Sequence, residues 1–174
     1  MRKVILGLAV SLDGYIEGPN GEYDWCFTDR DYGLNEFFQR VDALFIGRKS
    51  YELMQGQGEG SVPGMPKLKE YVFSTTLDHV KEGATLVQDN IKETVESIKK
   101  ESGKDIWMFG GASLTASLLE LGLIDEFWLS VHPIILGSGK PLFHDISKRT
   151  HLNLLETKTY DTGLVSLKYS LAKK

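Results

Sequence analysis

The segment from Ile106 to Phe143 constrains the fold of this chain more than any other. Its first four residues are apolar, as in a buried strand, and run directly into Gly110 and Gly111. Without side chains, these glycines let the backbone turn and let a ligand approach its N–H groups. Leucines spaced along the following residues predict an amphipathic helix that ends at Gly122. The first turn of such a helix presents free amides and a positive dipole end, so the segment predicts a site for an anionic cofactor.

The composition fits one enzyme-sized domain, predicted to span residues 1–174. With 174 residues, 41% of them hydrophobic, the chain suits a single core. The formal net charge is -4, from 20 Lys and Arg against 24 Asp and Glu, and neither sign forms a long run, so we expect no nucleic-acid partner. One cysteine and four scattered histidines predict neither an internal disulfide nor a metal site. The expected location is therefore a reducing compartment, the cytoplasm.

The apolar run after Arg2 and Lys3 resembles the start of a secretory signal. It ends at Ser11 to Gly14 without a small-residue cleavage pattern, and its Val, Ile and Leu residues suit a buried strand equally well. No other segment approaches the length of a membrane span. We therefore predict a first strand here and no membrane partner.

Eight segments have the apolar content of strands, and the early ones alternate with helices, which predicts a largely parallel sheet. The predicted strands are residues 2–10, 43–47, 70–75, 84–88, 105–109, 125–132, 152–160 and 163–171. Helices are predicted over 31–40 and 90–102, the second with Asn90 as its N-cap. The turn Asp161 to Gly163 predicts an antiparallel hairpin at the C-terminal end, so the expected α/β sheet is mixed.

The loosest segment runs from Gln55 to Pro66, with four glycines and two prolines. Its Gly56, Gly58 and Gly60 imitate a dinucleotide fingerprint, but they follow a predicted helix instead of a strand. We interpret this segment as a surface loop.

Several motifs occur in an order that resembles the dihydrofolate reductase superfamily. Three of them are Ser11 to Gly14, Gly47 to Glu52 and Gly110 to Ala112. Gly122 to Glu126 and Pro133 to Phe143 look more narrowly like the branch that holds the reductase domain of bacterial riboflavin biosynthesis and its stand-alone relatives. The resemblance covers nearly the whole chain. It implies a three-layer dihydrofolate reductase-like fold with helices on both faces of the sheet, a homodimer, and an NADPH-dependent oxidoreductase.

By this resemblance, NADPH lies across the strand ends, with its phosphates near Arg48 and Lys49 and its nicotinamide near Ala9 and Ile16. Cationic side chains beside free amides suit phosphate, although a solvated helix start has the same composition. The residues implied to bind the cofactor are Ala9, Ile16, Gly47, Arg48, Lys49, Ser50, Phe73, Ser74, Thr75, Phe109, Gly110, Gly111, Ala112, Ser113 and Leu114. The hydroxyls at 74 and 75 would favour NADPH over NADH, or would simply form a turn.

The resemblance implies hydride transfer to a pteridine, pyrimidine or related heterocycle, as in dihydrofolate reductase or 5-amino-6-(5-phosphoribosylamino)uracil reductase. A carboxylate in the helix after the first loop would supply the proton, and Asp29 and Asp31 lie near that place. Ser130 matches the hydroxyl that pairs with it in relatives. A small shift puts Leu34 or Asn35 there instead, and the two acids also fit a plain helix start.

The residues implied to face the substrate are Asp13, Trp25 and Phe38, with Phe37 as the alternative to Phe38. Aromatic side chains at these positions also fit a simple core, and Asp13 also fits a role in fixing its loop through local amides. Gly137 to Lys140 suits either a substrate phosphate or a tight loop at a dimer edge.

Two other functions stay open at this point. One is a catalytically silent module that keeps the NADPH cleft and binds the nucleotide or a heterocycle without turnover. The other is a structural dimer partner, which explains the apolar segment 126–136 but not the glycine turns.

Overall fold

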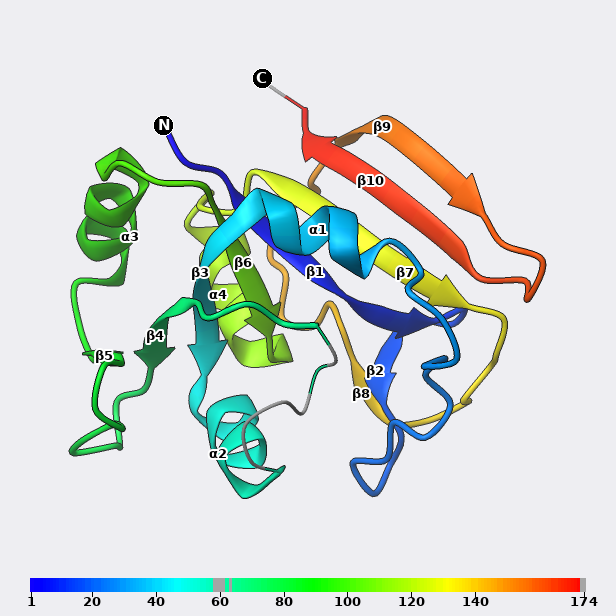
Figure 1. The fold of residues 1–174 in the computed structure, drawn as a ribbon, viewed down its shortest axis with the longest axis horizontal. Coiled ribbons are helices and arrows are strands. Elements are labelled where there is room, and N and C mark those ends of the chain that lie inside the picture. The colour runs from blue at the N-terminus through cyan, green and yellow to red at the C-terminus, as the bar shows by residue number, and fades with distance from the viewer. Residues whose placement is uncertain (58–61, 63, 173–174) are drawn as a thin grey trace.

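The computed structural model describes residues 1–57, 62 and 64–172 (Figure 1). Within them, eight strands form the main sheet, in the order β5-β4-β3-β6-β1-β7-β10-β9. These strands are β1 (Val4–Ser11), β3 (Val41–Gly47), β4 (Lys69–Phe73), β5 (Thr85–Val87), β6 (Asp105–Gly110), β7 (Glu126–His132), β9 (Leu152–Thr159) and β10 (Val165–Leu171). Two short strands, β2 (Tyr15–Glu17) and β8 (Lys140–Pro141), pair with each other in a separate sheet.

The main sheet is mostly parallel. β1 pairs in parallel with β6 and β7, and β3 pairs in parallel with β4 and β6. The carboxyl ends of these five strands therefore lie at the same end of the sheet. β10 runs antiparallel to β7 and to β9, which makes the C-terminal hairpin. The predicted mixed sheet of eight strands with a C-terminal hairpin is confirmed.

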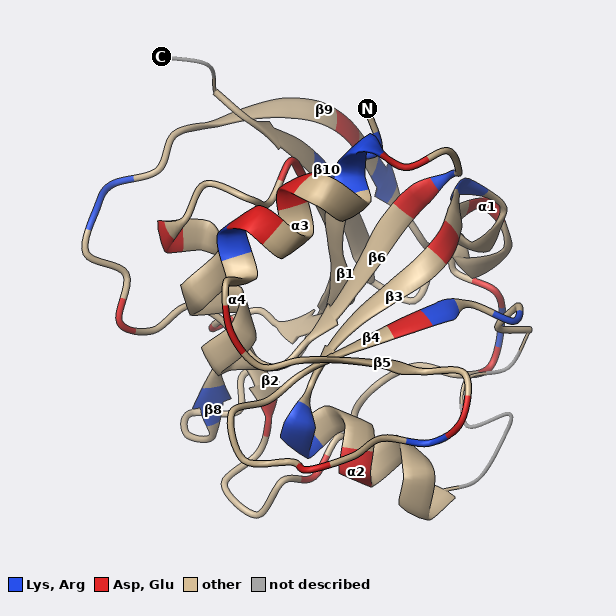
Figure 2. Cartoon of the chain, turned by 90° about the vertical axis from the view of Figure 1, so that its left-hand side faces the viewer, with Lys and Arg blue, Asp and Glu red and all other residues tan. Residues whose placement is uncertain are grey.

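Helices cover both faces of the sheet, as predicted. The helices α1 (Leu34–Arg40) and α2 (Arg48–Gln57) contribute to one core cluster, which includes Ile5 and Leu44. The helices α3 (Ile91–Lys100) and α4 (Ala112–Glu120) contribute to another, which includes Leu6 and Phe45. Neighbouring residues of a strand point to opposite faces, so both faces of the sheet are buried beneath helices (Figure 2). Within the described chain, no helix is both long and apolar enough to cross a membrane.

Four local predictions need correction. The helix predicted from residue 31 begins at Leu34, because Tyr32 and Gly33 have left-handed φ angles of 48° and 88°. Asn90 stands at the start of α3, but its φ is 45° and its side chain donates to Asp89, so it makes no side-chain cap. Third, the set of eight predicted strands omits β2 and β8, which have too few residues for a pattern to be recognised.

The fourth correction concerns the glycine-rich segment. Gly56 lies within α2, so the helix extends into the segment that we predict as a surface loop. Gly58 and Gly60 lie outside the described residues.

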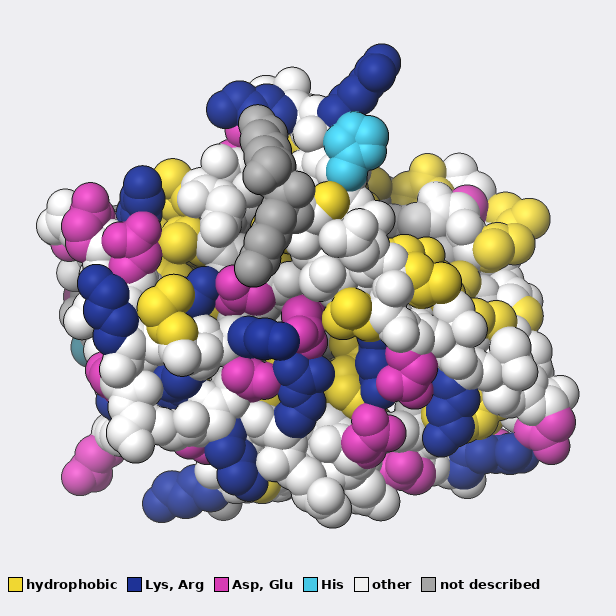
Figure 3. Space-filling view, turned by 90° about the horizontal axis from the view of Figure 1, so that it is seen from above, with side chains coloured by type: hydrophobic (Ala, Val, Ile, Leu, Met, Phe, Trp, Pro, Cys, Tyr) yellow, Lys and Arg dark blue, Asp and Glu magenta, His cyan; other side chains and the backbone are white. Residues whose placement is uncertain are grey.

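The end of the sheet where the parallel strands begin carries interleaved charges, seen from above in Figure 3. Lys3 bonds Glu126 at 2.6 Å, and Arg40 bonds both Glu126 and Asp105 at 2.8 Å. These pairs tie the amino ends of β1, β6 and β7 together. The opposite end of the sheet is left for the candidate site.

Candidate active site

The carboxyl ends of β3 and β6 meet at a pair of glycine turns. Ile46 lies opposite Gly110 in the strand register. A Cβ atom on Gly47 would lie 3.7 Å from both the carbonyl oxygen of Gly110 and the amide nitrogen of Gly111. α2 begins directly after Gly47 and α4 directly after Gly111. Two helix starts thus lie side by side, an arrangement that favours an anionic ligand.

The turn at Gly110 and Gly111 is bare. The φ of Gly110 is 115°, which strongly favours glycine, and a Cβ there would meet no atom within 4 Å. A Cβ on Gly111 would have Ser50 Oγ, 3.5 Å away, as its nearest neighbour. The peptide bond between the two glycines is cis. Because neither glycine carries a side chain, the turn leaves its backbone open to an anionic group such as a pyrophosphate.

Basic residues stand at the start of α2, below the sheet in Figure 2. Arg48 Nη1 lies 3.2 Å from Glu52 Oε2, one helical turn along, and the Arg48 side chain is 39% exposed. Lys49 is exposed. Exposed pairs of this kind contribute little free energy, so Arg48 can exchange Glu52 for a phosphate at small cost.

The end of β4 lies beside the same turn, since Phe73 pairs with Gly47 in the register. The Phe73 side chain is buried in the core rather than turned to the site. Ser74 Oγ accepts the backbone N–H of Thr76 at 3.1 Å and of Leu77 at 3.0 Å. This hydroxyl therefore shapes its own turn, while Thr75 is exposed.

A cavity of about 350 Å³ opens beside the glycine turns. Six of the sequence-predicted residues line it: Ala9, Ile16, Ser50, Phe109, Gly111 and Ser130. Gly47, Gly110, Ala112, Ser113 and Leu114 belong to the adjoining turns and helix start without lining it. The structure thus brings the predicted nicotinamide and pyrophosphate positions together around one space.

Aromatic side chains form the floor of this cavity: Phe37, the predicted alternative to Phe38, and two tryptophans that the sequence analysis left unassigned. The Phe37 ring meets Trp107 and Trp128 edge-on, at centroid distances of 5.4 and 5.2 Å. Both indole N–H groups are satisfied, because Trp107 donates to the carbonyl of Gly7 and Trp128 to the Ser166 hydroxyl. A Cβ on Gly7 would lie 2.8 Å from Phe37 Cζ, so a glycine there gives the ring its place. These rings suit contact with a flat, apolar ligand.

Other lining residues come from the stretch between the end of β2 and the start of α1, from the C-terminal half of α2, and from the segment after α2. They are Glu17, Tyr23, Cys26, Phe27, Tyr32, Gly33, Leu34, Leu53, Met54, Gln57 and Val62. One sequence signal could have located part of the cavity, namely the alternation of side chains along β6. Ile106 and Met108 face the core beneath α3 and α4, so Trp107 and Phe109 must face the opposite side of the sheet.

His132, at the end of β7, lines the cavity but has both ring nitrogens engaged. Nδ1 lies 3.0 Å from the carbonyl oxygen of Ser130, and Nε2 accepts the N–H of Phe27 at 3.1 Å. This pairing requires the proton on Nδ1 and a neutral ring, and burial lowers the pKa of His132. The imidazole therefore holds the segment around Phe27 in place.

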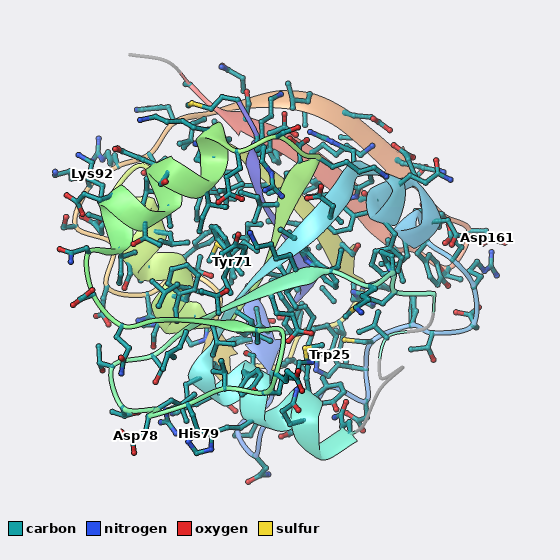
Figure 4. The ribbon with its side chains drawn as sticks, turned by 60° about the vertical axis from the view of Figure 1, so that its left-hand side comes forward. Trp25, Tyr71, Asp78, His79, Lys92 and Asp161 are labelled. Atoms are coloured by element: carbon teal, nitrogen blue, oxygen red, sulfur yellow. The ribbon has the colours of Figure 1, made fainter. Side chains whose placement is uncertain are left out.

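Trp25 packs behind His132, edge to face, with the ring centroids 5.4 Å apart. Its Nε1–H is buried and has no hydrogen-bond partner among the described residues. In Figure 4, Trp25 lies inside the fold near α2, whereas Asp78 and His79 lie at the margin. Trp25 supports the cavity wall without lining the cavity.

The two candidate proton donors lie off the cavity. Asp29 accepts the Tyr32 hydroxyl at 2.8 Å, and this bond is the main reason why the pKa of Asp29 is lowered. Asp31 accepts the N–H groups of Gly33 at 3.0 Å and Asn35 at 2.8 Å, at the start of α1. Asp29 is thus held ionised, and Asp31 fixes the helix start.

Asp13 and Phe38 also have structural surroundings. The Asp13 carboxylate accepts the Ser11 hydroxyl at 2.7 Å and the N–H groups of Leu136 and Gly137 at 3.1 and 2.8 Å. These bonds, that of Ser11 first, lower the pKa of Asp13. Phe38 is buried against the other aromatic residues of its core. Asp13 thus joins the loop after β1 to the loop before β8.

Two acidic side chains of the cavity lining, Glu17 and Cys26, are held by their surroundings. Glu17 pairs with Lys140 at 3.0 Å. Burial, helped by the charge of Asp24, raises the pKa of the Cys26 thiol to about 11. Among the described residues, no group of three or more His, Cys, Asp or Glu is placed to hold a metal ion. The site is suited to binding and orienting a ligand.

The fold and the glycine turns define a protein of the dihydrofolate reductase-like class. The family profile of the RibD C-terminal domain matches residues 2–166, so this chain belongs to that family. The predicted superfamily is thereby confirmed.

The uncharacterized protein YyaP of Bacillus subtilis (strain 168) is 45% identical, over 97% of this chain and 94% of YyaP. The crystal structure of a Shewanella sp. PV-4 protein named for riboflavin biosynthesis is similar with a TM-score of 0.84 and 25% identity, covering 99% of this chain and all (100%) of the other. Dihydrofolate reductase from Enterococcus faecalis, in complex with NADP(H), shares the fold with a TM-score of 0.72 and 14% identity, over 98% of this chain and 97% of that enzyme.

Proposed function

We propose that this chain is an NADPH-dependent reductase that transfers a hydride to a pteridine, pyrimidine or related heterocycle. The observation that carries the proposal is the contact between the Gly47 and Gly111 turns beside an aromatic cavity. Family membership and the NADP(H) complex of a similarly folded enzyme support it.

The chain's own residues have defined tasks in this proposal. Gly110 and Gly111 leave backbone for the pyrophosphate, Ser50 stands beside them, and Arg48 and Lys49 offer positive charge to phosphate. Ser74 and Thr75 are proposed to lie near the ribose phosphate. Ala9, Ile16 and Phe109 form the cavity wall beside the turn and would hold the nicotinamide.

When bound, NADPH supplies a hydride to an electron-poor C=N or C=O carbon. The substrate gains one C–H bond and one N–H or O–H bond, and NADP⁺ is released. We assign the added proton to water, because Asp29 is held ionised and Glu17 is paired. The contributions of the chain are orientation and exclusion of bulk water.

A catalytically silent NADPH-binding module is the second candidate. The observation that favours it is the engagement of the titratable groups around the cavity, including both ring nitrogens of His132. In either case we propose a homodimer located in the cytoplasm.

The two candidates are separated by following NADPH absorbance with dihydrofolate, a pyrimidine aminoketone and a flavin, beside calorimetric NADPH binding. A reductase binds NADPH and consumes it with at least one of the substrates. A silent module binds NADPH without consuming it, and a chain that does not bind NADPH is neither.

A further inference from the structure

We propose that the cavity takes an uncharged aromatic heterocycle and excludes substrates that carry a phosphate. This inference rests on the proposed reductase function and specifies its substrate class. It sets this chain apart from a reductase of phosphoribosylated pyrimidines.

The described lining of the cavity contains no Lys or Arg. Residues 58–61 and 63, outside the described part, are Gly, Glu, Gly, Ser and Pro, and so add no cation. The floor is formed by Phe37, Trp107 and Trp128, whose indole N–H groups already have partners. A phosphate placed against this surface would lose its water without gaining an ion pair, which is strongly unfavourable.

Acidic groups surround the same space. Glu17 lines it directly. The Tyr32 hydroxyl, from another lining residue, is bonded to the Asp29 carboxylate, and Asp24 is close enough to Cys26 to raise the pKa of its thiol. Glu17 and Asp29 are balanced by Lys140 and Arg30, so these surroundings offer an anion no excess positive charge.

The cations near the substrate side of the cavity are already held by acids, and Arg30 bonds Asp29 and Asp161. Arg48 and Lys49 lie at the start of α2, on the side proposed for the cofactor. Lys140 is paired with Glu17, a lining residue. A phosphate that bound Lys140 would leave the Glu17 carboxylate without its cation, so the cavity would gain no net positive charge. Lys168 lies 3.6 Å from the Trp128 ring centre and bonds Glu36 and Glu156, each at 2.9 Å. Neither Lys140 nor Lys168 is free to receive a phosphate.

A neutral heterocycle, in contrast, finds suitable partners. The aromatic rings offer apolar contact, and Ser130 and Gln57 offer a hydroxyl and an amide in the lining. A few polar groups among apolar ones are typical of small-molecule sites that fix a ring's orientation.

The test compares one substrate with and without its phosphate: 5-amino-6-ribosylaminouracil and its 5′-phosphate, each with NADPH. We expect kcat/KM for the riboside to exceed that for the phosphate by at least about 100-fold. Equal or better use of the phosphate overturns the inference and leaves the reductase proposal intact. Use of neither compound, with NADPH bound, also overturns it, whereas failure to bind NADPH removes the reductase proposal itself.

A variant of the chain tests the electrostatic cause. Leu53 lines the cavity and is 49% exposed, so a polar residue there should not disturb the core. Leu53→Lys should improve kcat/KM for the 5′-phosphate about tenfold over Leu53→Gln, with the riboside changed equally in both. If Leu53→Lys changed kcat/KM equally for the riboside and the 5′-phosphate, the missing cation would not be the reason why the phosphate is excluded.

Discussion

Gly47 and Gly111 lie so close that a Cβ on the first would stand 3.7 Å from the amide nitrogen of the second. Gly47 ends β3 and Gly111 directly follows the neighbouring parallel strand β6, and each is followed at once by a helix. Because neither carries a side chain, the starts of α2 and α4 open onto one shared space. This contact turns two weak sequence motifs into a single candidate cofactor site.

Gly111→Ala should weaken NADPH binding strongly while leaving the thermal midpoint nearly unchanged. The φ of Gly111 is -86°, which any residue adopts, and a Cβ has only an ordinary contact with Ser50 Oγ at 3.5 Å. The methyl group would instead occupy the space proposed for pyrophosphate, and Gly111→Val should do more damage. Calorimetry and thermal unfolding measure the two effects, with Gly56→Ala, an exposed helical site, as the control. Normal NADPH binding by the valine variant would rule out this placement.

Arg48→Ala should weaken NADPH binding by roughly 1.5–3 kcal/mol, the usual contribution of a hydrogen bond to a charged group. Glu52→Gln is the matched control, because it removes the same ion pair but keeps the cation. Its affinity should equal or exceed that of the unchanged chain. If calorimetry shows equal losses in both variants, Arg48 acts through the helix and not on the cofactor.

Gly7→Ala should lower the free energy of unfolding by about 1–3 kcal/mol, the typical cost of overpacking. The new methyl carbon would lie 2.8 Å from Phe37 Cζ, in a buried aromatic cluster that cannot yield freely. Denaturant unfolding measures the loss. Reversal of the loss in the double variant with Phe37→Leu would confirm the cause, and an unchanged deficit would contradict it.

Stability should fall as the pH decreases below about 6.5, the ordinary pKa of histidine. The folded pKa of His132 is lowered by burial, so over this range the unfolded chain binds a proton that the folded chain does not. The loss from this group stops once the pH is below the lowered pKa. The free energy of unfolding should be measured between about pH 7.5 and about pH 5. It should fall less steeply with decreasing pH in His132→Gln, whose amide oxygen can still accept the N–H of Phe27. The same slope in both proteins would exclude His132 as the source.

Leu154→Glu should shift the chain from dimer to monomer in sedimentation. β9 is the last strand of the sheet order, and its Leu154 and Leu155 are 56% and 53% exposed. An edge strand with exposed leucines favours association with a second copy. Leu121→Glu, at another exposed leucine, should leave the mass unchanged. A monomeric parent chain would contradict the proposed homodimer.

The sheet was predictable because its strands are short apolar runs bounded by turn residues. The helix start near residue 34 was not, since no pattern announces the left-handed backbone of Tyr32. Similarly, the side chain of Asn90 suits a cap by type, but its backbone angle prevents one.

The cofactor side of the site was more predictable than the substrate side. Glycines at strand ends are visible in a sequence, and Gly47, Gly110 and Gly111 do come together. The cavity floor depends on which face of β6 and β7 turns toward α1, so Trp107 and Trp128 read simply as core. His132 gave no signal, because its partner Phe27 lies far away in the chain.

The most direct test is a calorimetric titration of the unmodified protein with NADPH, beside one with NADH. The glycine-turn site predicts saturable binding of one NADPH per chain, with weaker binding of NADH. A titration without saturable heat, in a protein that is folded by circular dichroism, would contradict the claim that these strand ends hold a pyridine dinucleotide.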